Sequence, residues 1–413
     1  MTDQTPLPTS APTFRVSDVS AAQVLRAIRF RGPVSRSEVA DVTGLSKATV
    51  ARAVTTLQDL GAVRPQPGRM SQGATGRPGA MLELDPAGPV AIAVHIGLKN
   101  SVVAVCDLSC RVLAAREIPT ESSPGDAVDT LSAEAFRLLD GFRGRRLAAG
   151  GVATAARVTG GGCVDHDLLG WAGTPLGELF TETIGVPFSV APHVEAMAAA
   201  ELLVGHERHS GTTLLVYGRE YIGSALAIDG VVHQPSAGPA DLRYLPFGKV
   251  PHLDDRGEGL IDTVSDHGLV RAARKHGLTA ESVSALGELA AGEGGESGEA
   301  RAILRDRALA LGRVVGTVSA VLRPDTVVLA GQAFTDHPKY LPDVLAGSRE
   351  VAVAGRAPAL RVSTAGRRIQ EQAAMAVALD RLCADPEAVL SVGARPGGEE
   401  SRQKSSPKSG FAA

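Results

Sequence analysis

The chain has 413 residues, and its 42 basic and 45 acidic side chains give a formal net charge of -3. This length is enough for two or three domains, and the balanced charge excludes a polycation that binds nucleic acid or membrane along its whole length. Its four cysteines include no CxxC pair and no cluster with histidine at zinc-ligand spacing. Because no signal peptide and no run of eighteen apolar residues is present, we expect a soluble, cytoplasmic protein without membrane contact.

Three short helices are predicted between residues 16 and 61, where apolar residues recur at three- and four-residue spacing and glycines interrupt the pattern. A segment rich in Gly, Pro and Arg follows, and then the stretch MLELDP alternates apolar and polar residues like a strand. This order predicts a β-hairpin, or wing, after three helices.

Two helix starts lie in GPVSRSEVADVTGLSKATVARAVTTLQDLGAV. Ser35 and Glu38 have the spacing of a capping box, and Ser46 opens a second helix after a tight turn at residues 43–45. This is the spacing of a helix-turn-helix, whose second helix lies in the major groove with its N-terminal residues facing the bases. The residues predicted to contact DNA are Ser35, Arg36, Ser46, Lys47, Ala48, Thr49 and Arg52, with Arg69 and Arg77 of the wing.

Local charge agrees with a DNA-binding segment. Residues 14–80 hold ten basic and four acidic side chains, a local net charge of +6 in a chain of -3. Such a basic patch neutralises phosphates, and an arginine on the glycine-rich wing could enter a narrow minor groove. The competing interpretation is a three-helix protein-interaction module with a solvated basic face.

From residue 88 onward the pattern is that of an α/β body. VAIAVHIGL, SVVAVCDL and RVLAAREI predict an antiparallel three-strand meander, and TTLLVYGR, YIGSALAIDG and VVHQP predict a second one. Each meander is followed by helices and a further strand, so we expect two similar lobes with a ligand cleft between them.

These observations predict five segments. A disordered tail covers residues 1–15, a winged helix-turn-helix residues 16–87, and the first lobe residues 88–190. The second lobe covers residues 191–390, and the alternative that its last helices pack on the first lobe stays open. A second disordered tail covers residues 391–413.

Residues 34–63 and the following GRPGAMLELDP resemble the winged helix-turn-helix of the ROK family of repressors. The resemblance extends over about residues 20–385 and implies an α/β fold. In this fold the winged helix-turn-helix precedes a two-lobe body like that of actin and hexokinase. Kinase members of the family phosphorylate a sugar with ATP between the lobes. The resemblance to the regulatory members of the family implies a dimer that binds a palindromic DNA site.

The body resembles the family's kinases in the order of its motifs, but several motif residues differ. In HIGLKN, His95 replaces the acid of a DxGGT-like phosphate turn and Lys99 its threonine, and Glu220 stands in the second phosphate turn. In VAPHVEAMAAAELL, His193 replaces the catalytic aspartate. The cysteine-rich zinc turn is also missing. The resemblance therefore predicts a regulator that is not an enzyme and carries neither cofactor nor metal.

The family's sugar pocket has partial counterparts, which predict a sugar-like effector. The candidate effector-binding residues are Asp167, Trp171, His193, Glu195, Asp241, Tyr244 and Asp262. For Asp167 and Asp262 the alternative is a helix cap or a solvated turn, and for Trp171 and Tyr244 it is packing. Two other functions stay open: a sugar kinase with an added DNA-binding head, and an effector-independent regulator whose body is only a dimer scaffold.

Overall fold

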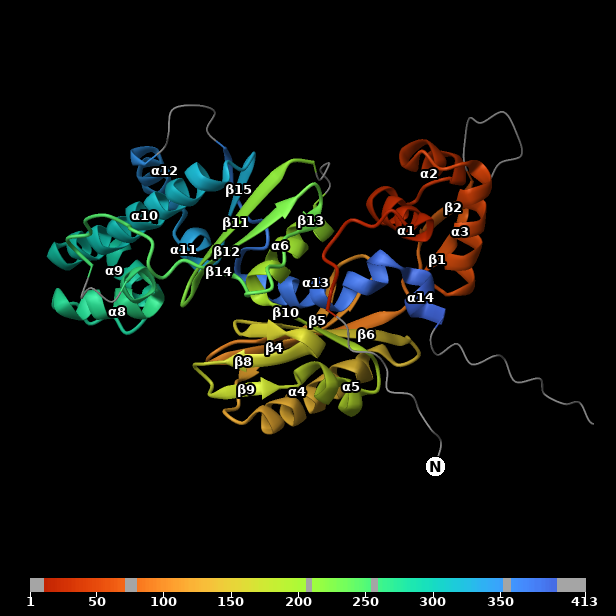
Figure 1. Ribbon diagram of the computed structural model, residues 1–413, viewed down its shortest axis with the longest axis horizontal. Helices are drawn as coiled ribbons and strands as arrows, with labels where there is room; N and C mark the ends of the chain where they lie inside the picture. Colours follow the sequence, from red (N-terminus) through yellow and green to blue (C-terminus); the bar gives the residue numbers. More distant parts are fainter. Residues whose placement is uncertain (1–10, 71–79, 206–209, 254–258, 352–357, 392–413) are drawn as a thin grey trace, which may run out of the picture.

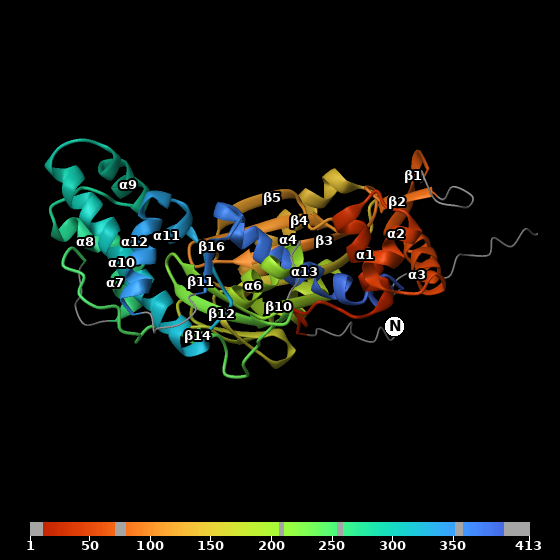
Figure 2. The same ribbon diagram turned by 90° about the horizontal axis from the view of Figure 1, so that it is seen from above.

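The computed structural model describes residues 11–70, 80–205, 210–253, 259–351 and 358–391 and has three parts, a head and two lobes (Figure 1). The head lies beside the first lobe. At the far end of the molecule lie four helices of the second lobe, α8 (Asp266–Lys275), α9 (Val283–Ala291), α10 (Gly295–Leu322) and α12 (Leu341–Glu350) (Figure 2). Within the described ranges, no helix is long and apolar enough to cross a membrane.

The head contains the three predicted helices and the hairpin. Its elements are α1 (Ser20–Arg31), α2 (Arg36–Thr43), α3 (Lys47–Asp59), β1 (Val63–Met70) and the antiparallel partner β2 (Ala80–Leu84). Apolar residues at helical spacing, such as Val50, Val54 and Leu57 of α3, are buried in a common core. The turn between α2 and α3 depends on Gly44, whose φ of 70° is strained for other residues.

The first lobe is a five-stranded sheet with the strand order β10-β6-β3-β4-β5. The strands are β3 (Val90–Ile96), β4 (Asn100–Asp107), β5 (Val112–Pro119), β6 (Leu147–Thr154) and β10 (Phe188–Pro192). One face packs on α4 (Pro124–Leu139) and α5 (Leu176–Ile184), near the small sheet of β7 (Arg157–Thr159), β8 (Cys163–His166) and β9 (Trp171–Thr174). The meander of β3, β4 and β5 is antiparallel, as predicted.

The second lobe repeats this topology in the order β13-β12-β11-β15-β16, so the prediction of two similar α/β halves is confirmed. Its strands are β11 (Thr212–Gly218), β12 (Ile222–Ile228), β13 (Val231–Val232), β14 (Ala240–Asp241), β15 (Thr326–Ala330) and β16 (Ala359–Val362). Its helices are α7 (Leu260–Val264), α8 (Asp266–Lys275), α9 (Val283–Ala291), α10 (Gly295–Leu322), α11 (Gln332–Thr335) and α12 (Leu341–Glu350).

Helices α6 (His193–Val204) and α13 (Ile369–Ala384) pack together between the two sheets, and α14 (Pro386–Ser391) follows α13 toward the head. Helix α13 lies on β3 and β6 of the first lobe, although it follows the second lobe in sequence. Gly151 of β6 permits this approach, because a Cβ at that position would collide with the backbone of Ala378. An almost unbroken run of small and apolar residues from Ala373 to Leu379 completes the contact.

Residues 11–15 are packed onto the body, so the prediction of a disordered tail through residue 15 is wrong there. The backbone N–H groups of Thr13 and Phe14 donate to the buried carboxylate of Asp380 on α13, at 2.6 and 2.8 Å. Phe14 is only 2% exposed, and Arg15 pairs with Val231 at the edge of the second sheet. The short polar segment gives no sequence signal for these partners, which come from residues more than 200 positions away.

Substitution of Gly151 tests the close packing of α13. In Gly151→Ala the new methyl group meets the backbone of α13, which cannot rotate away, so the free energy of unfolding should fall by about 2–3 kcal/mol. Gly141→Ala is the matched control, because a Cβ at Gly141 meets no atom within 4 Å. Chemical denaturation that gives equal stability for both variants would contradict the packing described here.

Candidate nucleic-acid interface and lobe junction

Helix α3 presents one exposed face to solvent. Ser46 caps the helix, with its hydroxyl accepting from the N–H of Thr49 at 3.1 Å, and Lys47, Ala48 and Arg52 are exposed beyond it. Ala51 and Thr55, which the sequence analysis did not select, are exposed on the same face. Ala51 lies three residues after Ala48 and Thr55 three residues after Arg52, and this helical spacing was the available signal.

The capping box of α2 changes how Ser35 is interpreted. Its hydroxyl accepts from the N–H of Glu38 at 3.2 Å, and the Glu38 carboxylate accepts from the N–H of Ser35 at 2.7 Å. Ser35 is buried, so its side chain orients α2, whereas the neighbouring Arg36 is exposed and donates to Gln58 of α3 at 3.3 Å. The side chain of Arg69 and the whole of Arg77 lie outside the described residues.

Two arginines counted in the basic patch are used inside the protein. Arg29 points from α1 into the body and donates to the carbonyl of Leu203 at 2.8 Å, and Arg64 pairs with Glu83 at 2.8 Å across the wing. The net charge of residues 14–80 therefore overstates the charge available to phosphates. The exposed basic residues Lys47 and Arg52 of α3, with Arg36 of α2, remain on the surface.

Four rings meet where the two lobes join. His193, the first residue of α6, lies with its ring 5.9 Å from that of His95 at the end of β3. The rings of Tyr217 and Tyr221, from the second lobe, lie 5.3 and 5.9 Å from His193. Both histidines are buried, and their Nε2 atoms have no hydrogen-bond partner among the residues that the structure describes.

Burial keeps these histidines neutral. Burial and the neighbouring His193 lower the pKa of His95 to about 3, and burial lowers the pKa of His193 to about 4. Glu195, two residues after His193 in α6, is also buried, and burial raises its pKa to about 7. The junction thus disfavours charge on each of the three groups, which is unlike a site that holds phosphates and a metal ion.

The two turns that the resemblance places at phosphate-binding positions contact each other across the lobes. Lys99, between β3 and β4, forms an ion pair of 3.2 Å with Glu220, between β11 and β12. A Cβ at Gly223 would collide with the ring of Tyr221, which fills the space beside the second turn. The ion pair thus joins the two turns, and the ring of Tyr221 packs beside the second.

The predicted effector residues are not brought together as one pocket. Trp171 is 4% exposed within the core of the first lobe, and its Nε1 donates to the carbonyl of Ser122 at 2.7 Å. Asp241 holds Arg243 through a contact of 2.7 Å, and Tyr244 is 82% exposed instead of packed. Asp167 and Asp262 are exposed on a turn and on α7. Of the seven, only His193 and Glu195 lie buried at the start of the same helix.

The sequence analysis missed two groups near the junction. His166, at the end of β8, is buried with its Nε2 unpartnered, and its proximity contributes to the lowered pKa of His193. Its inward position follows from the alternating burial of β8, in which Asp165 stays half-buried, and no sequence pattern that we used indicated it. Arg219 contributes to the lowered pKa of His95. In the part of the chain that the structure describes, no three His, Cys, Asp or Glu side chains are arranged to hold a metal.

Comparison with known families assigns both parts of the chain. A model of the MarR family matches residues 17–69, and the ROK family model matches residues 91–379. The chain belongs to the ROK family. Among curated relatives, the transcriptional regulators Rv0485 of Mycobacterium tuberculosis and Mb0495 of Mycobacterium bovis are each 37% identical over 393 residues, covering 92% of this chain and 89% of theirs. A winged helix-turn-helix joined to a ROK body is the organisation of a ROK-family transcriptional regulator.

Solved structures share the fold. A ROK-family transcriptional regulator described as a homologue of the E. coli MLC protein has a TM-score of 0.71 at 19% identity, covering 91% of this chain and 98% of its own. The ROK hexokinase of Thermus thermophilus has a TM-score of 0.56 at 22% identity, covering 70% of this chain and 97% of its own. The kinase likeness spans the body alone, whereas the regulator likeness includes the head.

The two junction histidines predict an acid-sensitive fold. Because their pKa values are depressed from 6.5 in the folded state, the unfolded chain binds more protons, so the stability they contribute is complete above about pH 6.5 and is lost as the pH falls toward 4. Each histidine should lower the free energy of unfolding there by up to about 1.4 kcal/mol per pH unit, and the raised pKa of Glu195 should offset one such contribution between its pKa of about 7 and the ordinary value of 4.5. Urea titrations should show a shallower fall in His95→Leu, and the wild-type slope in the exposed control His233→Gln.

Proposed function

We propose that this ROK-family regulator is a repressor that binds a specific DNA sequence through the N-terminal half of α3. The observation that carries the proposal is the exposed face of α3, where Lys47, Ala48 and Arg52 are free of the core while Val50, Val54 and Leu57 are buried. A recognition helix needs this division, because its buried side fixes the angle at which its exposed side enters the major groove. Arg36 lies at the start of α2, where it can contact a phosphate.

The proposed operator is palindromic and is bound by a homodimer. A symmetric dimer places two α3 helices at a fixed separation, and each helix reads one half-site. The body supplies the dimer contacts in this proposal. Sedimentation of the free protein should give a dimer, and a protected DNA segment should show two inverted half-sites.

Substitutions on α3 should weaken DNA binding. Arg52→Ala and Lys47→Ala should each reduce affinity for a selected duplex by about tenfold, because each removes a contact to a base edge or a phosphate. If Lys47 contacts a phosphate, its loss should also lower the slope of log affinity against log salt by about one. Fluorescence anisotropy over a salt series measures both effects.

Arg143→Ala is the matched control for these variants. Arg143 is an exposed arginine in the segment that follows α4, and its pairing with Asp140 at 3.0 Å is local. This variant should bind DNA like the wild type. Unchanged affinity in both α3 variants would contradict the proposed docking.

For the body we propose an effector-binding role without kinase activity. The Lys99–Glu220 ion pair and the ring of Tyr221 occupy the turns that would have to admit phosphates, and His193 is held neutral in an apolar setting. A base in such a position has no phosphoryl group to act on. The exposed groups at Asp241 and Asp262 leave polar surface that a sugar-like effector could contact after the lobes move.

The substitution His193→Asp tests the kinase alternative. A coupled assay with ATP and a panel of hexoses should show no turnover for the wild type and none for His193→Asp, because both phosphate turns remain filled. Turnover in either protein would establish a sugar kinase with an added DNA-binding head.

Calorimetry with sugars, amino sugars and phosphosugars separates the two regulatory possibilities. An effector must bind the DNA-competent and DNA-incompetent forms with different affinity, so it should both release heat and change the affinity for DNA. No heat and no change in DNA affinity across the panel would favour a body that acts only as a dimer scaffold.

A further inference from the structure

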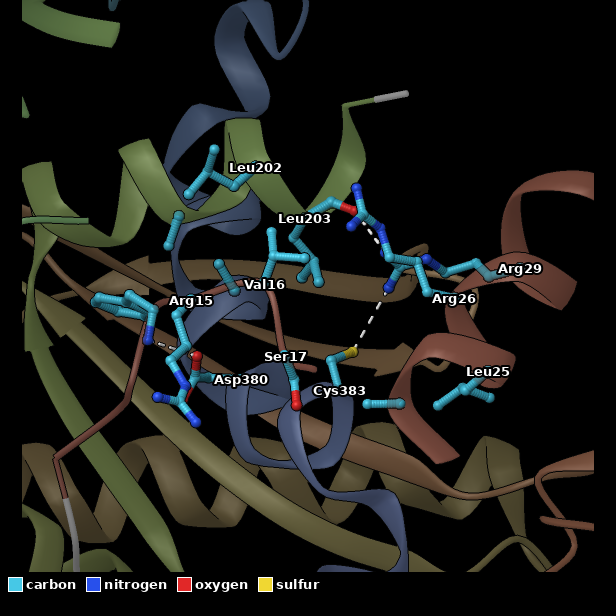
Figure 3. A pocket seen from close by; sticks show the side chains of 14 residues that line it. Arg15, Val16, Ser17, Leu25, Arg26, Arg29, Leu202, Leu203, Asp380 and Cys383 are labelled. Carbon is cyan, nitrogen blue, oxygen red and sulfur yellow. Dashed lines mark hydrogen bonds between the residues drawn. The ribbon is translucent and has the colours of Figure 1, made fainter. Parts of the chain in front are cut away.

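Arg29 joins the head to the body through two cysteine thiols. Its Nη1 donates to Cys110 Sγ at 2.8 Å. The same Nη1 donates to Cys383 Sγ at 3.5 Å, and Nη2 donates to the carbonyl of Leu203 (Figure 3). Cys110 lies in the turn between β4 and β5, Cys383 in the last turn of α13, and Leu203 on α6. One guanidinium from α1 therefore holds three separate elements of the body.

The two thiols differ in their ionisation. The hydrogen bond from Cys110, together with the positive charge of Arg29, lowers the pKa of Cys383, although burial opposes the shift. Burial raises the pKa of Cys110, which stays a protonated thiol. A thiolate beside a thiol is the arrangement in which one sulfur attacks an oxidant and the other resolves the product.

Cys383 can be reached by a small molecule. It lines a cavity of about 60 Å³ between the N-terminal segment, α1, α6 and α13, and the same cavity is lined by Ala22, Leu202 and Arg26 (Figure 3). A volume of roughly 10–15 Å³ on this measure already holds a water molecule, so a small peroxide fits. Neither Cys383 nor Cys110 is fully buried.

We propose that Cys110 and Cys383 are a modification site, a thiol pair that a hydroperoxide oxidises to an intramolecular disulfide, and that this bond loosens the head and weakens DNA binding. The first half concerns the thiols alone. The second half rests on the proposed DNA-binding function.

The reaction balances with one peroxide. The Cys383 thiolate attacks an oxygen of the peroxide, the O–O bond breaks, and hydroxide or an alkoxide leaves with a proton from solvent, which gives Cys383 sulfenic acid. The sulfur of Cys110 then attacks the Cys383 sulfur, the S–O bond breaks, and water leaves with the Cys110 proton. Two electrons from the two thiols reduce the peroxide to water, or to water and an alcohol.

Disulfide formation changes the surroundings of Arg29. A disulfide carries no charge, so the guanidinium loses its thiolate partner and keeps only the carbonyl of Leu203 among the acceptors named above. A charged group left unpaired in a half-buried site is unfavourable, which drives Arg29 and with it α1 toward water. Because α1 packs directly on α3, the recognition helix moves with it.

Mass spectrometry of the full-length protein tests the thiol pair. After treatment with hydrogen peroxide, the wild type should lose two hydrogens and yield a peptide linked through Cys110 and Cys383. Cys110→Ser should accumulate a sulfenic acid that dimedone traps at Cys383, and Cys383→Ser should form neither product. Cys163→Ser is the matched control, because Cys163 is half-buried on β8 and should leave the disulfide unchanged. Absence of the linked peptide from the wild type would overturn the proposal.

Anisotropy with a duplex selected by the reduced protein from a random-sequence pool tests the regulatory half. Oxidation should weaken binding by about tenfold, within the usual range of coupling between sites, and dithiothreitol should restore it. Peroxide should not alter binding by Cys383→Ser, which forms neither the sulfenic acid nor the disulfide. Identical curves for reduced and disulfide-linked protein would overturn this half. Failure of the reduced protein to select any duplex would instead contradict the proposed function, while the mass measurement still decides the thiol pair.

Discussion

Close packing of α13 on the first sheet is the contact on which the rest of the structure depends. The helix can lie on β6 because Gly151 has no side chain to hold it off, and its small residues allow α6 to pack against it from the other side. This position brings the end of α13 to the head and its middle to the N-terminal segment. Helix α13, which follows the second lobe in sequence, therefore contacts both lobes and the head.

The connection between head and body uses polar groups on that helix. Asp380 of α13 holds the segment before α1 through two backbone N–H groups, and that segment also pairs with the edge of the second sheet at Val231. Cys383, one turn later, contacts Arg29 within α1. The head is thus attached to both lobes, and a movement of one lobe relative to the other has a physical route to α3.

The lobe junction is a cluster of buried rings in a ROK-family body. His193 begins α6 at the place where the resemblance puts the catalytic aspartate, but it packs among His95, Tyr217 and Tyr221 and is held neutral by burial. Glu201 of the same helix binds Arg361 and Ser363 of the second lobe at 2.7 and 2.6 Å. Glu201 thus connects α6 to β16 and to the residues that follow it.

The sequence by itself determined the order of the elements and their type. The signals used were local: helical spacing, glycine turns, and capping residues such as Ser35 and Ser46. The winged helix-turn-helix and both meanders could therefore be predicted from residues close together in the chain. Tertiary structure decided which polar groups meet. From the sequence, Arg29 is a surface cation, Trp171 is a candidate effector-binding residue, and Phe14 lies in an expected disordered tail. In the fold, Arg29 contacts two thiols, Trp171 lies in the core of the first lobe, and Phe14 is buried. Each outcome depends on partners far away along the chain, and no local pattern encodes such contacts.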